Sequence, residues 1–272
     1  MMRLFFLTAI GAGGLYILTL GGLYLFQEQL VFFPKQKIKR TPGSLGLEYT
    51  DLNLRTEDNV TIHGWYVPAD SARATVLYFH GNANNIGVRV EFIRMLHDMG
   101  LNVCAIDYRG YGRSEGKPTE EGTYLDAKAS WRYLISERHL APEKIILLGR
   151  SLGGAVAVWL ATQVEPGGLI LGSTFTSLPE ISQEKYPVFP AARLVKMEYN
   201  TLSKIRQISC PVLITHSRDD NIVPFSHGRR LYEAANPPKE FLEMRGGHNE
   251  NLWLSMAEYR EKLNEFVTQY LE

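Results

Sequence analysis

A serine in a glycine-rich turn is the residue whose surroundings most clearly suggest chemistry. Ser151 lies in the motif Gly-Arg-Ser-Leu-Gly-Gly, residues 149–154, between the strand-like run 144–148 and a segment with helical spacing. A serine on a sharp turn between strand and helix projects its hydroxyl above the sheet, and the flanking glycines let the two elements approach closely. A helix N-cap would explain the serine but not both glycines. We therefore expect Ser151 to be a nucleophile.

A serine hydroxyl is a weak nucleophile unless a general base lies beside it. After Ser151 the sequence has three histidines, His216, His227 and His248. The first closes the apolar run 211–215 and the second falls in a helical pattern, whereas His248 follows two glycines just after the last predicted strand. Because a glycine loop has the freedom to bring an imidazole back over the nucleophile, His248 is the predicted base.

A carboxylate must hold that imidazole in its productive tautomer and stabilise the imidazolium, without itself taking the proton. With a serine on this kind of turn, the acid lies between serine and histidine in the chain. The only aspartates after Ser151 are Asp219 and Asp220, in the loop after the strand that ends at His216. Both lie at the correct end of the sheet, and spacing alone does not separate them.

The oxyanion formed during attack needs backbone N–H donors. One is expected from Leu152, directly after the nucleophile, and another from the loop 80–84 that follows the apolar run 74–79, where we choose Asn82. A turn that merely ends the strand is the alternative for this loop. Asp107, in a glycine-rich and arginine-rich segment, resembles a site residue, but it precedes the nucleophile and we expect a structural role.

The elements that must position these groups alternate between strand and helix. The predicted strands are 47–55, 60–67, 74–79, 101–106, 144–148, 168–171, 211–215 and 240–244, and the predicted helices are 88–99, 120–138, 151–162, 226–235 and 249–271. Short, apolar, non-alternating strands between helices indicate a parallel sheet covered on both faces. Residues 178–208 hold no predicted strand, and we interpret them as a small lid over the ligand crevice. An ordinary surface excursion is the alternative.

The N-terminal segment has a different composition from the rest. Leu4 to Phe26 is a run of 23 residues without a charge, long enough for a membrane helix. A cleaved signal peptide would have a shorter apolar region, of about 7–15 residues, and a small-residue cleavage site, which does not follow here. We predict an uncleaved membrane anchor over 1–33, a linker over 34–46 and a catalytic domain over 47–272. A buried helix is the alternative, and the few flanking charges leave the side of the membrane open.

Composition argues against several other classes of function. Lys+Arg and Asp+Glu number 29 each, so no net field favours nucleic acid. The two cysteines, Cys104 and Cys210, lie in apolar stretches and are interpreted as small core residues. Since no Cys/His spacing is typical of a metal site, we expect no metal.

Together these motifs resemble the α/β-hydrolase superfamily, and within it the serine hydrolases similar to Bem46 and to α/β-hydrolase domain-containing proteins 13 and 17. The resembling segments are 29–34, 63–65, 78–85, 107–112, 149–154, 173–177, 211–216 and 247–249. The resemblance implies an eight-stranded, mostly parallel sheet and hydrolysis of an ester, thioester or amide without a cofactor. It also implies the acid: the pattern His-Gly-x-x-Asp-x-x-Val-Pro falls on Asp220, with Ser217 in place of the glycine.

The expected function is a membrane-anchored serine hydrolase that cleaves carboxylic esters or acyl thioesters through Ser151, Asp220, His248 and an acyl-enzyme. Aromatic and apolar residues of the predicted lid suggest a small-molecule or lipid-like acyl ester as substrate. An amide-cleaving peptidase would use the same groups. A non-catalytic membrane adaptor with this fold is the alternative of another class, and the intact set of three residues argues against it.

Overall fold

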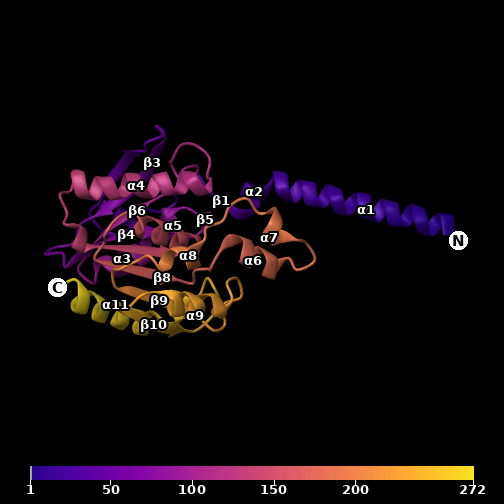
Figure 1. The fold of residues 1–272 in the computed structure, drawn as a ribbon. Helices are drawn as coiled ribbons and strands as arrows, with labels where there is room; N and C mark the ends of the chain where they lie inside the picture. The colour runs from indigo at the N-terminus through magenta and orange to yellow at the C-terminus, as the bar shows by residue number, and fades with distance from the viewer. Residues whose placement is uncertain (1) are drawn as a thin grey trace.

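The computed structural model describes residues 2–272, without the side chains of residues 2–4 and 7–9, and places an eight-stranded sheet at its centre (Figure 1). The strand order is β10-β9-β8-β7-β4-β6-β3-β2. All neighbours are parallel except the β2–β3 and β3–β6 pairs. The mostly parallel sheet is therefore confirmed. The strands are β2 (Thr50–Arg55), β3 (Thr61–Val67), β4 (Ala74–Phe79), β6 (Leu101–Ile106), β7 (Ile145–Arg150), β8 (Gly168–Gly172), β9 (Val212–Ser217) and β10 (Lys239–Met244).

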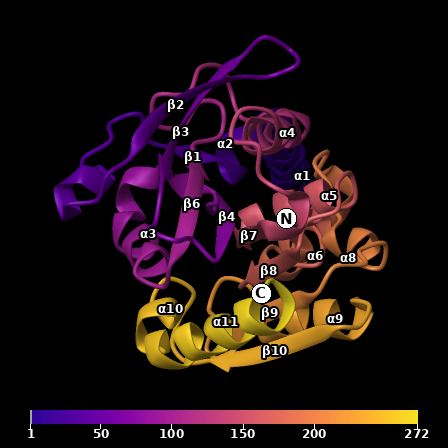
Figure 2. The same cartoon turned by 90° about the vertical axis from the view of Figure 1, so that its left-hand side faces the viewer.

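Helices cover both faces of the sheet (Figure 2). They are α3 (Val90–His97), α4 (Glu120–Ser136), α5 (Leu152–Ala161), α8 (Thr201–Ile205), α9 (Phe225–Ala234), α10 (Asn251–Leu254) and α11 (Met256–Tyr270). Alternate residues of the central strands supply a core on each face: in β4, Leu77 and Phe79 pack with residues of α4 and α5, while Val76 and Tyr78 pack with residues of α3 and α11. Burial on both faces explains why these strands are continuously apolar.

The predicted closing helix 249–271 is two helices in the structure, α10 and α11. The break falls at Ser255, whose hydroxyl oxygen accepts a hydrogen bond from the backbone N–H of Arg245 at 2.9 Å. This bond ties the break to the end of β10. The chain between β10 and α10, which contains His248, is thereby held at both ends.

The N-terminal chain forms α1 (Met2–Leu25), α2 (Gln27–Val31) and β1 (Phe33–Pro34). Figure 1 shows α1 extending away from the body. Among the side chains that the structure describes, no helix is long and apolar enough to cross a membrane. The side chains of Leu4, Leu7, Thr8 and Ala9 in the predicted anchor are not among those described. The transmembrane character of this segment stays a prediction, as do the domain boundaries.

The predicted lid interval, 178–208, contains α6 (Leu178–Lys185), α7 (Ala191–Leu194) and α8, and no strand. α6 packs against α7, and α7 contacts α1. The ring of Tyr16 in α1 stacks on that of Phe189 just before α7, with centroids 5.8 Å apart. The interval therefore touches the N-terminal helix, and its role as a lid stays a prediction.

Candidate active site

Ser151 lies at the turn between β7 and α5 in a backbone conformation that side chains rarely adopt, with φ 53° and ψ −119°. Neighbouring glycines make this turn possible. A Cβ on Gly153 would lie 2.1 Å from the carbonyl oxygen of Phe79, and one on Gly149 would lie 2.2 Å from that of Gly153. The strand and helix therefore approach more closely than any side chain at these positions would allow, and the serine is raised at the end of the sheet.

His248 and Asp220 are hydrogen-bonded to each other. The imidazole Nδ1 lies 2.8 Å from Oδ2 and 3.0 Å from Oδ1 of the carboxylate. Oδ1 also accepts the backbone N–H groups of Ile222, at 2.9 Å, and Val223, at 2.8 Å. Burial alone would raise the pKa of Asp220, but His248 and these two N–H groups together hold that pKa below its usual value. The carboxylate is therefore kept ionised beside the imidazole.

The other candidates for base and acid have different surroundings. Asp219 is exposed and accepts a 3.3 Å bond from the N–H of Gly246. His216 is buried behind Asp220 and donates through Nε2 to the carbonyl of Val223 at 2.9 Å. His227 is buried between Thr176 and Glu184. Of the three histidines, His248 alone lines the same pocket as Ser151.

The loop after β4 lies against the serine. A Cβ on Gly81 would be 3.5 Å from the Cβ of Ser151. The backbone N–H groups of the next residue, Asn82, and of Leu152 have no acceptor among the residues that the structure describes. Leu152 is the first residue of α5, where the N–H groups of a helix are left without intrahelical partners. Two free N–H groups thus flank Ser151.

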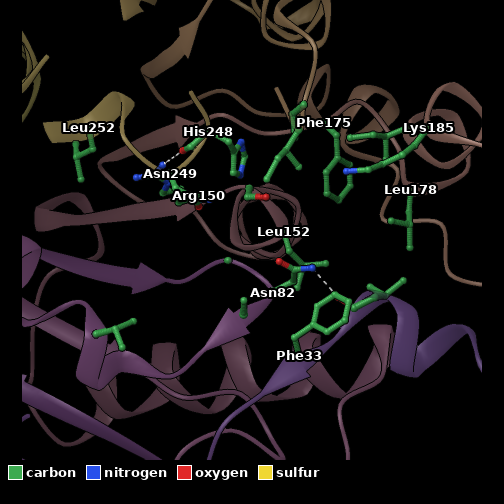
Figure 3. Close-up of a pocket in the computed structure, with 18 of the residues that line it drawn as sticks. Phe33, Asn82, Arg150, Leu152, Phe175, Leu178, Lys185, His248, Asn249 and Leu252 are labelled. Carbon is green, nitrogen blue, oxygen red and sulfur yellow. Dashed lines mark hydrogen bonds between the residues drawn. The ribbon is translucent and has the colours of Figure 1, made fainter. Parts of the chain in front are cut away.

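Asn82 is held in place by the N-terminal segment, since β1 pairs in parallel with β5 (Ala83–Asn84). Its carbonyl oxygen accepts the N–H of Phe33 at 2.9 Å and the hydroxyl of Tyr111 at 2.6 Å. Its side-chain amide donates to the carbonyl of Val31 at 2.7 Å. Figure 3 shows Asn82 beside Phe33 at the edge of the pocket. Residues that the sequence assigned to an anchor therefore position the candidate oxyanion loop.

A buried polar cluster lies behind this loop. Asp107 has no exposed surface, and its Oδ1 accepts the N–H of Ile86 at 2.8 Å. The imidazoles of His80 and His63 lie 3.5 Å and 3.7 Å from the carboxylate. Burial would raise the pKa of Asp107, and the two histidines, together with the N–H of Ile86, outweigh that effect and lower it. Asp107 does not line the pocket, which agrees with a structural role.

The pocket around Ser151 and His248 has a volume of about 440 Å³, within the range of small-molecule sites. Its walls come from both ends of the chain. The apolar lining residues include Leu30, Val31, Phe33, Phe175, Leu178, Ile181 and Trp253. α6 and the N-terminal segment thus form a largely apolar side of the pocket.

The sequence did not suggest a role for Arg150, the residue before the nucleophile. Its guanidinium donates to the backbone carbonyl of His248 (Figure 3) and, at 3.1 Å, to Oδ1 of Asn251. These acceptors lie about a hundred residues further along the chain, so no local pattern could have revealed them. Arg150 positions the loop that carries the imidazole.

Known proteins resemble the chain over most of its length. The family model described as serine aminopeptidase, S33, matches residues 70–194. Bem46 of Schizosaccharomyces pombe is 34% identical, covering 76% of this chain and 74% of Bem46. α/β-Hydrolase domain-containing protein 17B of Homo sapiens is 36% identical, covering 74% of this chain and 68% of its own length. An uncharacterized membrane protein of Saccharomyces cerevisiae is 33% identical, covering 88% and 90%.

Solved structures show the same architecture. An esterase of Pyrococcus furiosus superposes with a TM-score of 0.74 and is 26% identical, covering 88% of this chain and all of the esterase. The sheet order, the turn at Ser151 and the relatives of similar length all point to the same family. The chain belongs to the α/β-hydrolase superfamily, in the group that contains Bem46 and α/β-hydrolase domain-containing protein 17B.

Proposed function

We propose that this hydrolase is a serine esterase that cleaves carboxylic esters or acyl thioesters. One observation carries the proposal: His248, hydrogen-bonded to the buried Asp220, lines the same pocket as Ser151. A nucleophile, a base and a group that orients the base are the parts that acyl transfer requires. The two free N–H groups beside the serine supply the remaining part.

In the proposed reaction, the Oγ of Ser151 attacks the acyl carbon while Nε2 of His248 takes the hydroxyl proton. The N–H groups of Asn82 and Leu152 donate to the oxyanion, and each such donor is worth roughly 10²–10³ in rate. The imidazolium then gives its proton to the leaving alcohol or thiol, which leaves an acyl-serine. Water, deprotonated by His248, hydrolyses that intermediate and restores the serine. Asp220 orients the imidazole through Nδ1 in both halves.

The lining of the pocket favours an ester over a peptide. An aminopeptidase has to bind the free ammonium group of its substrate, for which a carboxylate is the natural partner. None of the described residues that line the pocket is aspartate or glutamate. Its apolar side suits an acyl chain instead. The esterase of Pyrococcus furiosus supports the same choice of reaction.

We further propose that α1 attaches the enzyme to a membrane. Its side chains include large apolar groups exposed by more than half, among them Ile10, Leu15, Ile17, Leu18 and Leu25. A stretch of apolar surface this long is costly to leave in water. Cell fractionation would test the attachment: the protein should stay with membranes after alkaline carbonate washing, and release by that wash would count against it.

Covalent labelling tests the reaction. The full chain should react with a fluorophosphonate probe, which modifies only activated serines, and Ser151→Ala should abolish the labelling. Hydrolysis of a panel of neutral acyl esters should disappear in the same variant. If the folded wild-type protein neither reacts nor hydrolyses any ester, the hydrolase fold would serve a non-catalytic membrane adaptor instead.

A further inference from the structure

The pocket around Ser151 carries positive charges that the proposed reaction does not use. Arg89, Arg150 and Lys185 line it, whereas no carboxylate of the described residues does. Lys185 is exposed and has solvent around it. The two arginines are half-buried, and their surroundings decide what the pocket can bind.

Arg150 has no carboxylate partner among the residues that the structure describes. Its guanidinium donates to two neutral oxygens, the carbonyl of His248 and the side-chain amide oxygen of Asn251. Burial is the main effect that lowers the pKa of Arg150, and the charge of Arg89 lowers it further. The charge of Asp220 also acts on it, but that carboxylate is already hydrogen-bonded to His248. The positive charge of Arg150 is therefore left uncompensated at the pocket wall.

The guanidinium of Arg89 also lacks a carboxylate partner among the described residues. It lies just before α3, and its Nη2 makes a long 3.4 Å bond to the carbonyl of Ala83. Its Nε is buried and has no hydrogen-bond partner among the described residues. A buried charged donor without an acceptor is costly, and two guanidinium groups that repel each other add to that cost. An anion bound between them would remove both effects.

Arg150 and the apolar side chains of Phe175 and Leu178 lie on different sides of the imidazole. In Figure 3, Arg150 and Leu252 lie on one side of His248, and Phe175, Leu178 and the exposed Lys185 lie on the other. An ester whose reacting carbonyl lies beside His248 would therefore extend in both directions. One end would meet the arginines and the other the apolar wall.

Building on the proposed esterase function, we infer that the substrate is an amphiphilic ester that carries an anionic group, a carboxylate or a phosphate, which binds between Arg89 and Arg150. Its alkyl chain lies against the apolar side of the pocket, which α6 and the N-terminal segment form. The anion can belong either to the acyl part or to the alcohol part of the ester. Both cases place the reacting carbonyl between an anion site and an apolar site.

Two matched pairs of substrates distinguish these cases. In the first, the acyl part carries the charge: the 4-nitrophenyl monoester of adipic acid is compared with 4-nitrophenyl hexanoate. In the second, the alcohol part does: 1-octanoylglycerol 3-phosphate is compared with 1-octanoylglycerol. The anionic member of at least one pair should have a kcat/KM roughly tenfold higher, because charge-assisted bonds are stronger than neutral ones. Added salt should reduce that ratio.

Arg89→Gln should remove most of the preference for the anionic ester, and Arg89→Lys should restore part of it. The exposed Arg260 on α11, which lies outside the pocket, supplies the matched control, since Arg260→Gln should leave the ratio unchanged. Equal or faster cleavage of the neutral member in both pairs would overturn the inference. So would a ratio that does not respond to Arg89→Gln in a protein with an unchanged melting temperature.

A binding measurement separates this inference from the esterase proposal. Octyl phosphate and octyl glucoside are titrated into Ser151→Ala, with and without Arg89→Gln, and followed by calorimetry. Tighter binding of octyl phosphate that depends on Arg89 supports the anion site even if no ester is cleaved. Hydrolysis of neutral esters without such binding contradicts the anion site and leaves the esterase function standing.

Discussion

The backbone N–H of Phe33 donates a 2.9 Å hydrogen bond to the carbonyl oxygen of Asn82. Asn82, whose own N–H is the candidate donor to the oxyanion, is therefore held in place by the chain that follows α1. The carbonyl of Val31 holds the side chain of Asn82 in the same way. The last residues of the predicted anchor, Val31 and Phe33, thus help to position the candidate site.

Truncation should reveal this dependence. A chain that begins at Phe26 keeps α2 and β1 and should retain ester hydrolysis, whereas one that begins at Lys35 loses both Val31 and Phe33. Because the oxyanion loop would then lack two of its contacts, we expect kcat to fall roughly a hundredfold, the scale of one lost donor. Circular dichroism would verify that both proteins fold. Similar kcat values in the two folded proteins would contradict this role for the segment.

The backbone strain at Ser151 should be measurable as stability. With φ 53° and ψ −119°, this residue has a conformation that glycine adopts at lower cost than any side chain. Ser151→Gly should therefore unfold at a higher temperature than Ser151→Ala, by about 1 kcal/mol or roughly 2–4 °C. Both variants lack the hydroxyl and should be inactive, so activity does not enter the comparison. A glycine variant no more stable than the alanine variant would mean that the turn stores no strain.

Asp219 and Asp220 offer a matched pair of substitutions. Asp220→Asn should lower kcat by about 10⁴, because an amide would stabilise the wrong tautomer of His248. Asp219→Asn should change kcat by less than about threefold, because that carboxylate is exposed and accepts its bond from the N–H of Gly246. Steady-state kinetics on one neutral ester would separate them. If Asp219→Asn lowered kcat more than Asp220→Asn, the acid would be Asp219 and the assignment to Asp220 would be wrong.

The sequence predicted the parts of the candidate site that depend on local patterns. The turn at Ser151 needs small neighbours within four positions, and the alternation of strand and helix needs only local periodicity. It separated Asp220 from Asp219 only by resemblance, since what distinguishes them is burial against Val223 and His248. Burial of this kind depends on contacts across the fold, which spacing does not contain.

The N-terminal wall of the pocket was not predictable for a related reason. An apolar run has the same composition whether its side chains face lipid, a protein core or a substrate. The pairing of Phe33 with Ala83 joins positions fifty residues apart and became visible only in the fold. The contact of Arg150 with the His248 loop is longer-range still. Residues that position a site from elsewhere in the chain leave little local signature.

The ionisation of Asp220 predicts how stability depends on pH. Its pKa in the folded protein is lower than in the unfolded chain, where an aspartate has a pKa of about 3.9. The carboxylate therefore stabilises the fold fully above that unfolded value, and the contribution is lost as the pH falls through the folded value. Asp220→Asn should lose less stability than the wild type on acidification below about pH 5. Urea unfolding at several pH values would show it, and parallel curves would contradict it.

The position of α6 leads to a prediction about acyl length. Ile181 projects from this helix into the pocket, on its apolar side. Ile181→Trp should fill part of the roughly 440 Å³ pocket, and it should lower kcat/KM for an octanoyl ester by about tenfold while an acetyl ester changes little. The matched control is Val188→Trp, on the exposed part of the same interval, where 79% of the side chain is in solvent. If both variants treat short and long esters alike, α6 does not bound the acyl site and the interval 178–208 is an ordinary surface excursion. If only Ile181→Trp shortens the preferred chain, the interval acts as the predicted lid.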